Sequence, residues 1–161
     1  MFHIILFTPQ IPPNTGNIIR LSANTGTQLH LIEPLGFQLD AKSCRRAGLD
    51  YHALANVHLH KNLDECFIIL GSARLFAITS HGTKSLFDQK FAAGDAFLFG
   101  SETAGLPQLI HARFTDEEKL RLPMIVGNRS LNLANAASIV VYEAWRQIGF
   151  STGCKDKNFV C

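Results

Sequence analysis

The sequence lacks the features that mark several large classes of proteins. It has no apolar run near the roughly 18 residues that a membrane-spanning helix requires. Residues 1–7 have neither the charged start nor the cleavage site of a signal peptide. The four cysteines are scattered without a C-x-x-C pair, which favours reduced thiols over a disulfide framework or a zinc cage. We therefore expect a cytoplasmic protein that has no contact with a membrane.

Familiar catalytic and nucleotide-binding motifs are also missing. The chain contains no G-x-G-x-x-G, no G-x-x-x-x-G-K-[ST] and no G-x-S-x-G. A nucleotide-dependent hydrolase or oxidoreductase would need a phosphate-binding loop that this sequence does not show. His58 and His60 alternate as on one face of a strand, and a partly exposed strand edge is a better interpretation than a metal site. The other histidines form no recognisable constellation, so we expect no metal.

The size and composition predict a single folded unit. A chain of 161 residues with 47% apolar content can bury a sizeable core. We expect one domain over residues 1–150, followed by a disordered tail over residues 151–161. The net charge of +2 is too small to imply a polyanionic partner by itself. Basic residues nevertheless gather locally at Lys42, Arg45 and Arg46.

Short apolar runs alternate with segments of helical character. Because the predicted strands lack clean polar alternation, we expect an α/β fold with a mostly parallel sheet and helices on both faces. Residues 8–13 contain three prolines and should preclude regular structure. The predicted strands are 2–7, 29–32, 57–59, 74–79, 97–99 and 119–123. The predicted helices are 17–25, 41–47, 62–70 with Asn62 as its cap, 108–112, and a long final helix.

The stretch 122–135 is the most informative part of the chain. A loop rich in Gly, Asn and Ser follows Pro123, and the first turns of the final helix carry Ser130, Asn132 and Asn135. One helix cap would explain one of these side chains but not all three. We interpret the loop as one wall of a binding site. A second loop, residues 100–106, also follows a predicted strand, and ligands of parallel α/β sheets bind at the carboxyl ends of the strands.

The final helix is apolar nearly all round. Such a helix is buried on two sides, and in a small protein the second side can be covered by another copy of the chain. We therefore predict a homodimer, with Tyr142 and Trp145 near the contact. The predicted site itself offers Asn, Arg, Glu and Ser without an evident nucleophile or metal. This set suits a reaction in which a bound small molecule brings the reactive group.

Three segments resemble the motifs of the SPOUT superfamily of RNA methyltransferases, in order and spacing. They are residues 13–20 (PNTGNIIR), 99–107 (FGSETAGLP) and 122–133. Residues 11–20, 31–37, 45–51 and 142–146 narrow the resemblance to tRNA (cytidine/uridine-2'-O)-methyltransferases of the wobble position, the TrmL type. The similarity covers roughly residues 2–150.

This resemblance implies S-adenosyl-L-methionine as methyl donor, S-adenosyl-L-homocysteine as product, a C-terminal trefoil knot and an obligate dimer. It also implies positions for the functional residues. The implied donor-binding residues are Ile78, Thr79, Gly100, Leu122, Ser130 and Leu131. The implied residues of the reaction centre are Asn14, Arg20, Glu102, Ser130 and Asn132.

The resemblance also implies tRNA as partner, through a nucleotide of the anticodon loop. We expect Lys42, Arg45, Arg46 and Arg129 to contact backbone phosphates. A guanidinium keeps its proton at ordinary pH, so we expect Arg20 to stabilise a substrate phosphate or the developing alkoxide rather than to abstract the proton.

Two alternatives stay open at this point. A noncatalytic RNA-binding module would use the same basic residues but would not bind S-adenosylmethionine. A related enzyme could methylate a ribose elsewhere in tRNA or in ribosomal RNA, because motifs at the donor site do not determine the acceptor.

Overall fold

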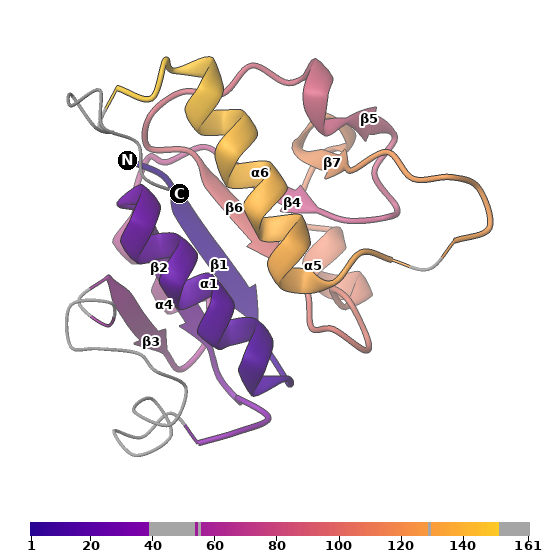
Figure 1. Ribbon diagram of the computed structural model, residues 1–161. Helices are drawn as coiled ribbons and strands as arrows, with labels where there is room; N and C mark the ends of the chain where they lie inside the picture. The colour runs from indigo at the N-terminus through magenta and orange to yellow at the C-terminus, as the bar shows by residue number, and fades with distance from the viewer. Residues whose placement is uncertain (39–53, 55, 129, 152–161) are drawn as a thin grey trace.

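A parallel sheet of seven strands forms the centre of the protein (Figure 1). The computed structural model describes residues 1–38, 54, 56–128 and 130–151. The strand order is β3-β2-β1-β6-β4-β7-β5, and each neighbouring pair is parallel. The strands are β1 (His3–Phe7), β2 (Gln28–Ile32), β3 (Val57–His60), β4 (Leu75–Ile78), β5 (Lys84–Ser85), β6 (Ala96–Phe99) and β7 (Lys119–Arg121).

Helices cover both faces of this sheet, which confirms the predicted α/β architecture (Figure 1). On one face, α1 (Pro12–Thr25) and α6 (Leu133–Gln147) contact each other and bury their apolar sides against β1, β2 and β6. On the other face lie α4 (Leu63–Leu70) and the short α5 (Gln108–His111). Two 3-10 turns complete the fold: η1 (Leu86–Asp88) follows β5, and η2 (Asp116–Glu118) precedes β7. No helix in the described part of the chain has the length and apolar character to cross a membrane.

Most predicted elements appear within two residues of their expected bounds. The cap of α4 is confirmed, since the Asn62 side chain accepts a hydrogen bond from the backbone N–H of Glu65. The predicted helix 41–47 lies outside the described residues. The two-residue strand β5 was not predicted, because so short a segment leaves no periodic pattern.

The first helix begins earlier than predicted. We expected residues 8–13 to preclude regular structure, but α1 starts at Pro12, with proline in its first turn. Proline fits the first turn of a helix because its missing N–H would have had no partner there. The consequence is that Asn14 lies inside the helix, buried, and not in a loop.

The prediction for His60 was wrong, because this side chain is buried and not at an exposed edge. Only His58 of the pair is exposed, whereas His60 is 3% exposed and forms a hydrogen bond with His30. The statement that the other histidines form no constellation was wrong too, since His3 also forms a hydrogen bond with His30. Strands distant in sequence bring these rings together, so no local spacing could reveal them.

Candidate active site

A cavity of about 460 Å³ lies where β4, β6 and β7 end. These strands are neighbours in the order β6-β4-β7 and run in one direction, so the loops that follow them meet at one edge of the sheet. The start of α1 and the first turn of α6 complete the wall. The lining residues are 11, 14, 78–81, 99–106, 111, 122, 124, 130–133 and 136.

The loop after β6 folds tightly back on itself. Ser101 and Gly105 exchange two backbone hydrogen bonds of 3.2 and 2.9 Å, and the Ser101 hydroxyl accepts a third from the N–H of Ala104. Gly100 is required where the two ends of this loop meet. A Cβ atom at position 100 would lie 2.1 Å from the carbonyl carbon of Gly105 and 2.4 Å from the nitrogen of Leu106.

The Glu102 carboxylate ties this loop to the start of α1. It accepts hydrogen bonds from the backbone N–H groups of Gln10 (2.8 Å) and Ile11 (3.2 Å) and from the side-chain amide of Asn14 (3.0 Å). Burial raises the pKa of Glu102, but these donors and a further bond from its own backbone outweigh burial and lower the pKa below its ordinary value. Glu102 is therefore a carboxylate at neutral pH.

Asn14 extends this network to α6. Its side-chain oxygen accepts a 2.8 Å hydrogen bond from the amide of Asn132. The Asn132 oxygen in turn accepts from the N–H groups of Ala134 and Asn135, which makes Asn132 the cap of α6. Three segments that are remote in sequence thus share one chain of side-chain hydrogen bonds.

The structure brings together nearly all residues that the sequence singled out for this site. The six predicted donor-binding residues, Ile78, Thr79, Gly100, Leu122, Ser130 and Leu131, all line the cavity. Asn14, Glu102, Ser130 and Asn132 line it as well. Their roles in binding and chemistry stay predictions.

Arg20 is the exception among the predicted site residues. It lies on the exposed side of α1, and the residues lining the cavity do not include it. The predicted RNA-binding residues Lys42, Arg45, Arg46 and Arg129 lie outside the described residues.

A pair of histidines at the cavity was missed. The rings of His81 and His111 lie 5.5 Å apart between centroids in an edge-to-face arrangement, and both residues line the cavity. Burial, His81 and Lys119 lower the pKa of His111 and favour its neutral form. His81 follows β4, so the rule that strand-end loops share one edge could have placed it here, whereas nothing in the sequence joins it to His111.

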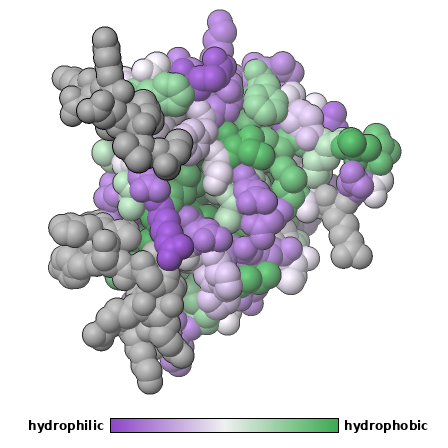
Figure 2. All heavy atoms as spheres, in the orientation of Figure 1, coloured by the Kyte–Doolittle hydropathy of each residue, from purple (hydrophilic) through white to green (hydrophobic). Residues whose placement is uncertain are grey.

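The loop between β7 and α6 exposes apolar side chains beside the cavity. Ile125 is 80% exposed and Val126 is 99% exposed. Figure 2 shows apolar atoms projecting at the tip of this loop. These two neighbouring apolar side chains are therefore left in solvent beside the cavity.

Comparison of the sequence with models of known protein families shows the family to which this chain belongs. The model of the SpoU rRNA Methylase family matches residues 1–142. A relative from Methylovorus glucosotrophus, named tRNA (cytidine(34)-2'-O)-methyltransferase, is 54% identical over 151 residues, which are 94% of this chain and 98% of that protein.

Solved structures of RNA methyltransferases are also similar to this chain. One, described as structural insights into the 2-OH methylation of C/U34 on tRNA, superposes with a TM-score of 0.85 at 43% identity and covers 93% of this chain and 97% of the other. The SpoU methyltransferase AviRb from Streptomyces viridochromogenes, in complex with the cofactor AdoMet, superposes with a TM-score of 0.77 at 27% identity, over 94% of this chain and 58% of the other.

We predict that Gly100→Ala destabilises the protein by about 1–3 kcal/mol, the usual cost of overpacking. The added methyl group would overlap backbone atoms of Gly105 and Leu106, which cannot rotate away as a side chain can. Urea unfolding followed by circular dichroism measures the change. Thr103→Ala, in the same loop but exposed, should alter the free energy of unfolding by less than about 0.5 kcal/mol. Equal effects of the two substitutions would contradict the steric argument.

We predict that Glu102→Gln destabilises the protein by about 1–3 kcal/mol at pH 7, because an amide cannot accept all three hydrogen bonds and loses the charge that strengthens them. A carboxylate whose folded pKa is lowered stabilises the fold above its ordinary pKa of 4.5, and that contribution is lost as the pH falls through the folded pKa. The difference between wild type and variant should therefore shrink below pH 4.5.

Urea titrations at pH 7 and pH 3.5 measure this difference. The matched control is Glu117→Gln, which removes an exposed carboxylate paired with Lys84 and should cost less than about 1 kcal/mol. A Glu102→Gln effect of the same size at both pH values would show that the charge is not what stabilises the loop.

Proposed function

Because the chain belongs to the SpoU rRNA Methylase family, we propose that it is a tRNA methyltransferase that modifies the ribose 2'-hydroxyl of nucleotide 34, a cytidine or a modified uridine. The observation that carries this proposal is the cavity at the carboxyl ends of β4, β6 and β7, formed by the loops that carry the resemblance. The specificity for nucleotide 34 is supported by a relative that is 54% identical over nearly its whole length and is named for that position.

The cavity has the properties that S-adenosylmethionine requires. Its volume of about 460 Å³ lies within the range of roughly 300–1,000 Å³ that is usual for small-molecule sites. Ile78 and Leu122 offer apolar side chains for the adenine, while Thr79, Gly100 and Leu131 offer backbone groups. When bound, the donor supplies a methyl group on a positively charged sulfur. The Glu102 carboxylate at the cavity wall favours that charge.

The acceptor hydroxyl must lose a proton as it reacts. We assign no protein base to this proton, because a guanidinium cannot accept it at ordinary pH. Arg20 instead stabilises the substrate phosphate or the developing alkoxide, and the proton leaves through phosphate or water. The exposed position of Arg20 on α1 supports a contact with RNA rather than with the donor. Lys42, Arg45, Arg46 and Arg129 would bind backbone phosphates of the anticodon loop.

The functional unit of this proposal is a homodimer, with a trefoil knot in the C-terminal part of each chain. The exposed side of α6 supports the dimer, since Ile139 is 38% and Tyr142 49% exposed. Trp145 packs edge-to-face against Tyr142 and Phe150, and its indole N–H is buried without a partner within the described residues. β7 lies between β4 and β5 instead of at the edge, and this return of the chain into the sheet supports the knot. We propose that the enzyme acts in the cytoplasm, which a tRNA substrate supports.

We predict that the protein transfers labelled methyl from S-adenosylmethionine to one position of unmodified tRNA. Nuclease digestion and mass spectrometry should locate the label on the ribose of nucleotide 34. The matched substrate is the same tRNA with 2'-deoxyribose at position 34, which should accept no methyl group because the acceptor oxygen is absent. Label at another nucleotide, or equal labelling of the deoxy substrate, would contradict the proposed specificity.

The same assay tests Arg20. Arg20→Ala should lower kcat/KM by about 100-fold, the order of loss expected for one charge-stabilising group. Asn17→Ala removes another exposed polar side chain of α1 and should leave kcat/KM within about twofold. Comparable losses in the two variants would assign the effect to the helix surface and not to the guanidinium.

We predict a dimer of 17.8 kDa chains at micromolar concentration, measured by light scattering. Tyr142→Asp places an unpaired charge in the proposed contact and should shift the protein toward the monomer. Ile68→Asp is the matched control, because Ile68 is 80% exposed on α4, on the opposite face of the sheet. A monomeric wild type, or equal dissociation by both variants, would contradict the proposed interface.

A further inference from the structure

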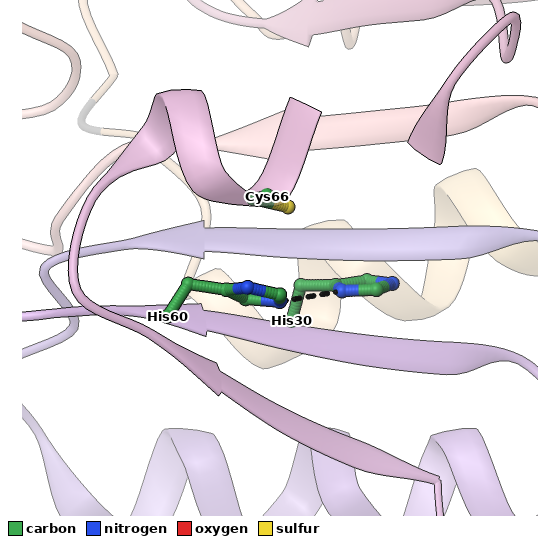
Figure 3. Close-up of side chains that lie close together, drawn as sticks. All are labelled: His30, His60 and Cys66. Carbon is green, nitrogen blue, oxygen red and sulfur yellow. Dashed lines mark hydrogen bonds between the residues drawn. The ribbon is translucent and has the colours of Figure 1, made fainter. Parts of the chain in front are cut away.

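A cluster of two histidines and one cysteine lies on the face of the sheet that α4 covers. His30 of β2, His60 at the end of β3 and Cys66 of α4 are 2%, 3% and 0% exposed. One ring nitrogen from each histidine and the Cys66 sulfur lie within 4.8 Å of one another. Figure 3 shows the two rings end to end, with Cys66 nearby on α4. None of the three residues lines the cavity of the methyltransferase site.

Hydrogen bonds orient the two rings. Nδ1 of His30 and Nε2 of His60 lie 2.9 Å apart, and Nε2 of His30 lies 3.1 Å from Nδ1 of His3. When Nε2 of His30 donates its hydrogen to His3, the lone pair on Nδ1 is directed toward His60. A partner on the far nitrogen that fixes the tautomer is typical of histidines that bind metals. With the hydrogen on Nε2, the contact with His3 holds His30 in the form that a metal would need.

We propose that His30, His60 and Cys66 form a three-coordinate binding site for copper(I). Thiolate and imidazole are the donors that copper(I) accepts readily, and two His with one Cys in a trigonal arrangement is a donor set that proteins use for copper. Among the His, Cys, Asp and Glu side chains of the described residues, these three lie close enough together to share one ion.

The charge of the site selects a monovalent ion. Ile5, Ile32 and Leu63 belong to the same buried cluster as Cys66, so a net charge here would be costly. One copper(I), one thiolate and two neutral imidazoles sum to zero. Zinc would leave one positive charge and one coordination position without a protein ligand, because zinc sites are almost always four-coordinate.

Binding requires small movements and no change of oxidation state. If copper(I) makes bonds as long as those of zinc, about 2.0 Å to nitrogen and about 2.3 Å to sulfur, three donors around it lie roughly 3.5 Å apart. The rings of His30 and His60 therefore separate by roughly half an ångström from their hydrogen-bonded distance, and the Cys66 side chain turns inward. A copper–sulfur bond forms as the thiol releases its proton to solvent. Nε2 of His60, which donates its hydrogen to His30 in the empty site, gives up that hydrogen, and Nδ1 of the same ring takes up a proton from solvent, so that the imidazole stays neutral. The ion joins α4 to β2 and β3.

The experiment uses the full chain with Cys44, Cys154 and Cys161 replaced by serine, so that Cys66 is the sole thiol. Copper(I), buffered anaerobically with the chelator bicinchoninate, is titrated into this protein and into the same protein carrying Cys66→Ala. We expect one ion per chain, a rise in melting temperature, and an affinity at least about 100-fold higher with Cys66 than without it. X-ray absorption at the copper edge should show one sulfur and two nitrogen neighbours.

Equal affinity in the two proteins, or an absorption spectrum that contains sulfur neighbours alone, would overturn the proposal. Circular dichroism checks that Cys66→Ala is folded. If it is not, His60→Gln in the same background replaces it, and the same loss of affinity is expected. Methyl transfer serves as a separate readout, because none of the three residues contributes to the cavity.

Discussion

The carboxylate of Glu102 is the group on which the geometry of the site depends. It binds the backbone that leads into α1 and the side chain of Asn14, and Asn14 binds the cap of α6. Glu102 lies 88 residues from Asn14, and Asn14 lies 118 from Asn132. Three remote segments therefore cannot shift independently without breaking these hydrogen bonds. The shape of the cavity wall depends on them for this reason.

The order of the strands explains why one short chain can build such a site. β6, β4 and β7 are adjacent, and their carboxyl ends deliver loops from residues 79, 100 and 122 to the same edge. β1 lies on the other side of β6, so the chain that follows it brings α1 to that edge as well. The cluster of His30, His60 and Cys66 lies at the other end of the strand order, beside β2 and β3. The proposed methyltransferase site and the proposed copper site therefore lie in separate parts of the fold.

Much of this arrangement follows from the sequence, and the failures have physical causes. The apolar runs predicted the strands, and the Asn62 cap and the site loops were placed correctly because their determinants are local. The start of α1 was misplaced because prolines were taken as breakers, although the first turn of a helix accepts them. The burial of His60 and the pairing of His81 with His111 depend on tertiary contacts that no local pattern encodes. The resemblance supplied what periodicity could not, above all the identity of the donor.

The central claim is that the loops after β4, β6 and β7 form the pocket of the methyl donor. A crystal structure of the protein with S-adenosylhomocysteine tests it most directly. The account predicts the ligand in the cavity bounded by residues 78–81, 100–106 and 122–132, with its adenine between Ile78 and Leu122. A ligand bound at any other surface, with this cavity filled only by solvent, would contradict it.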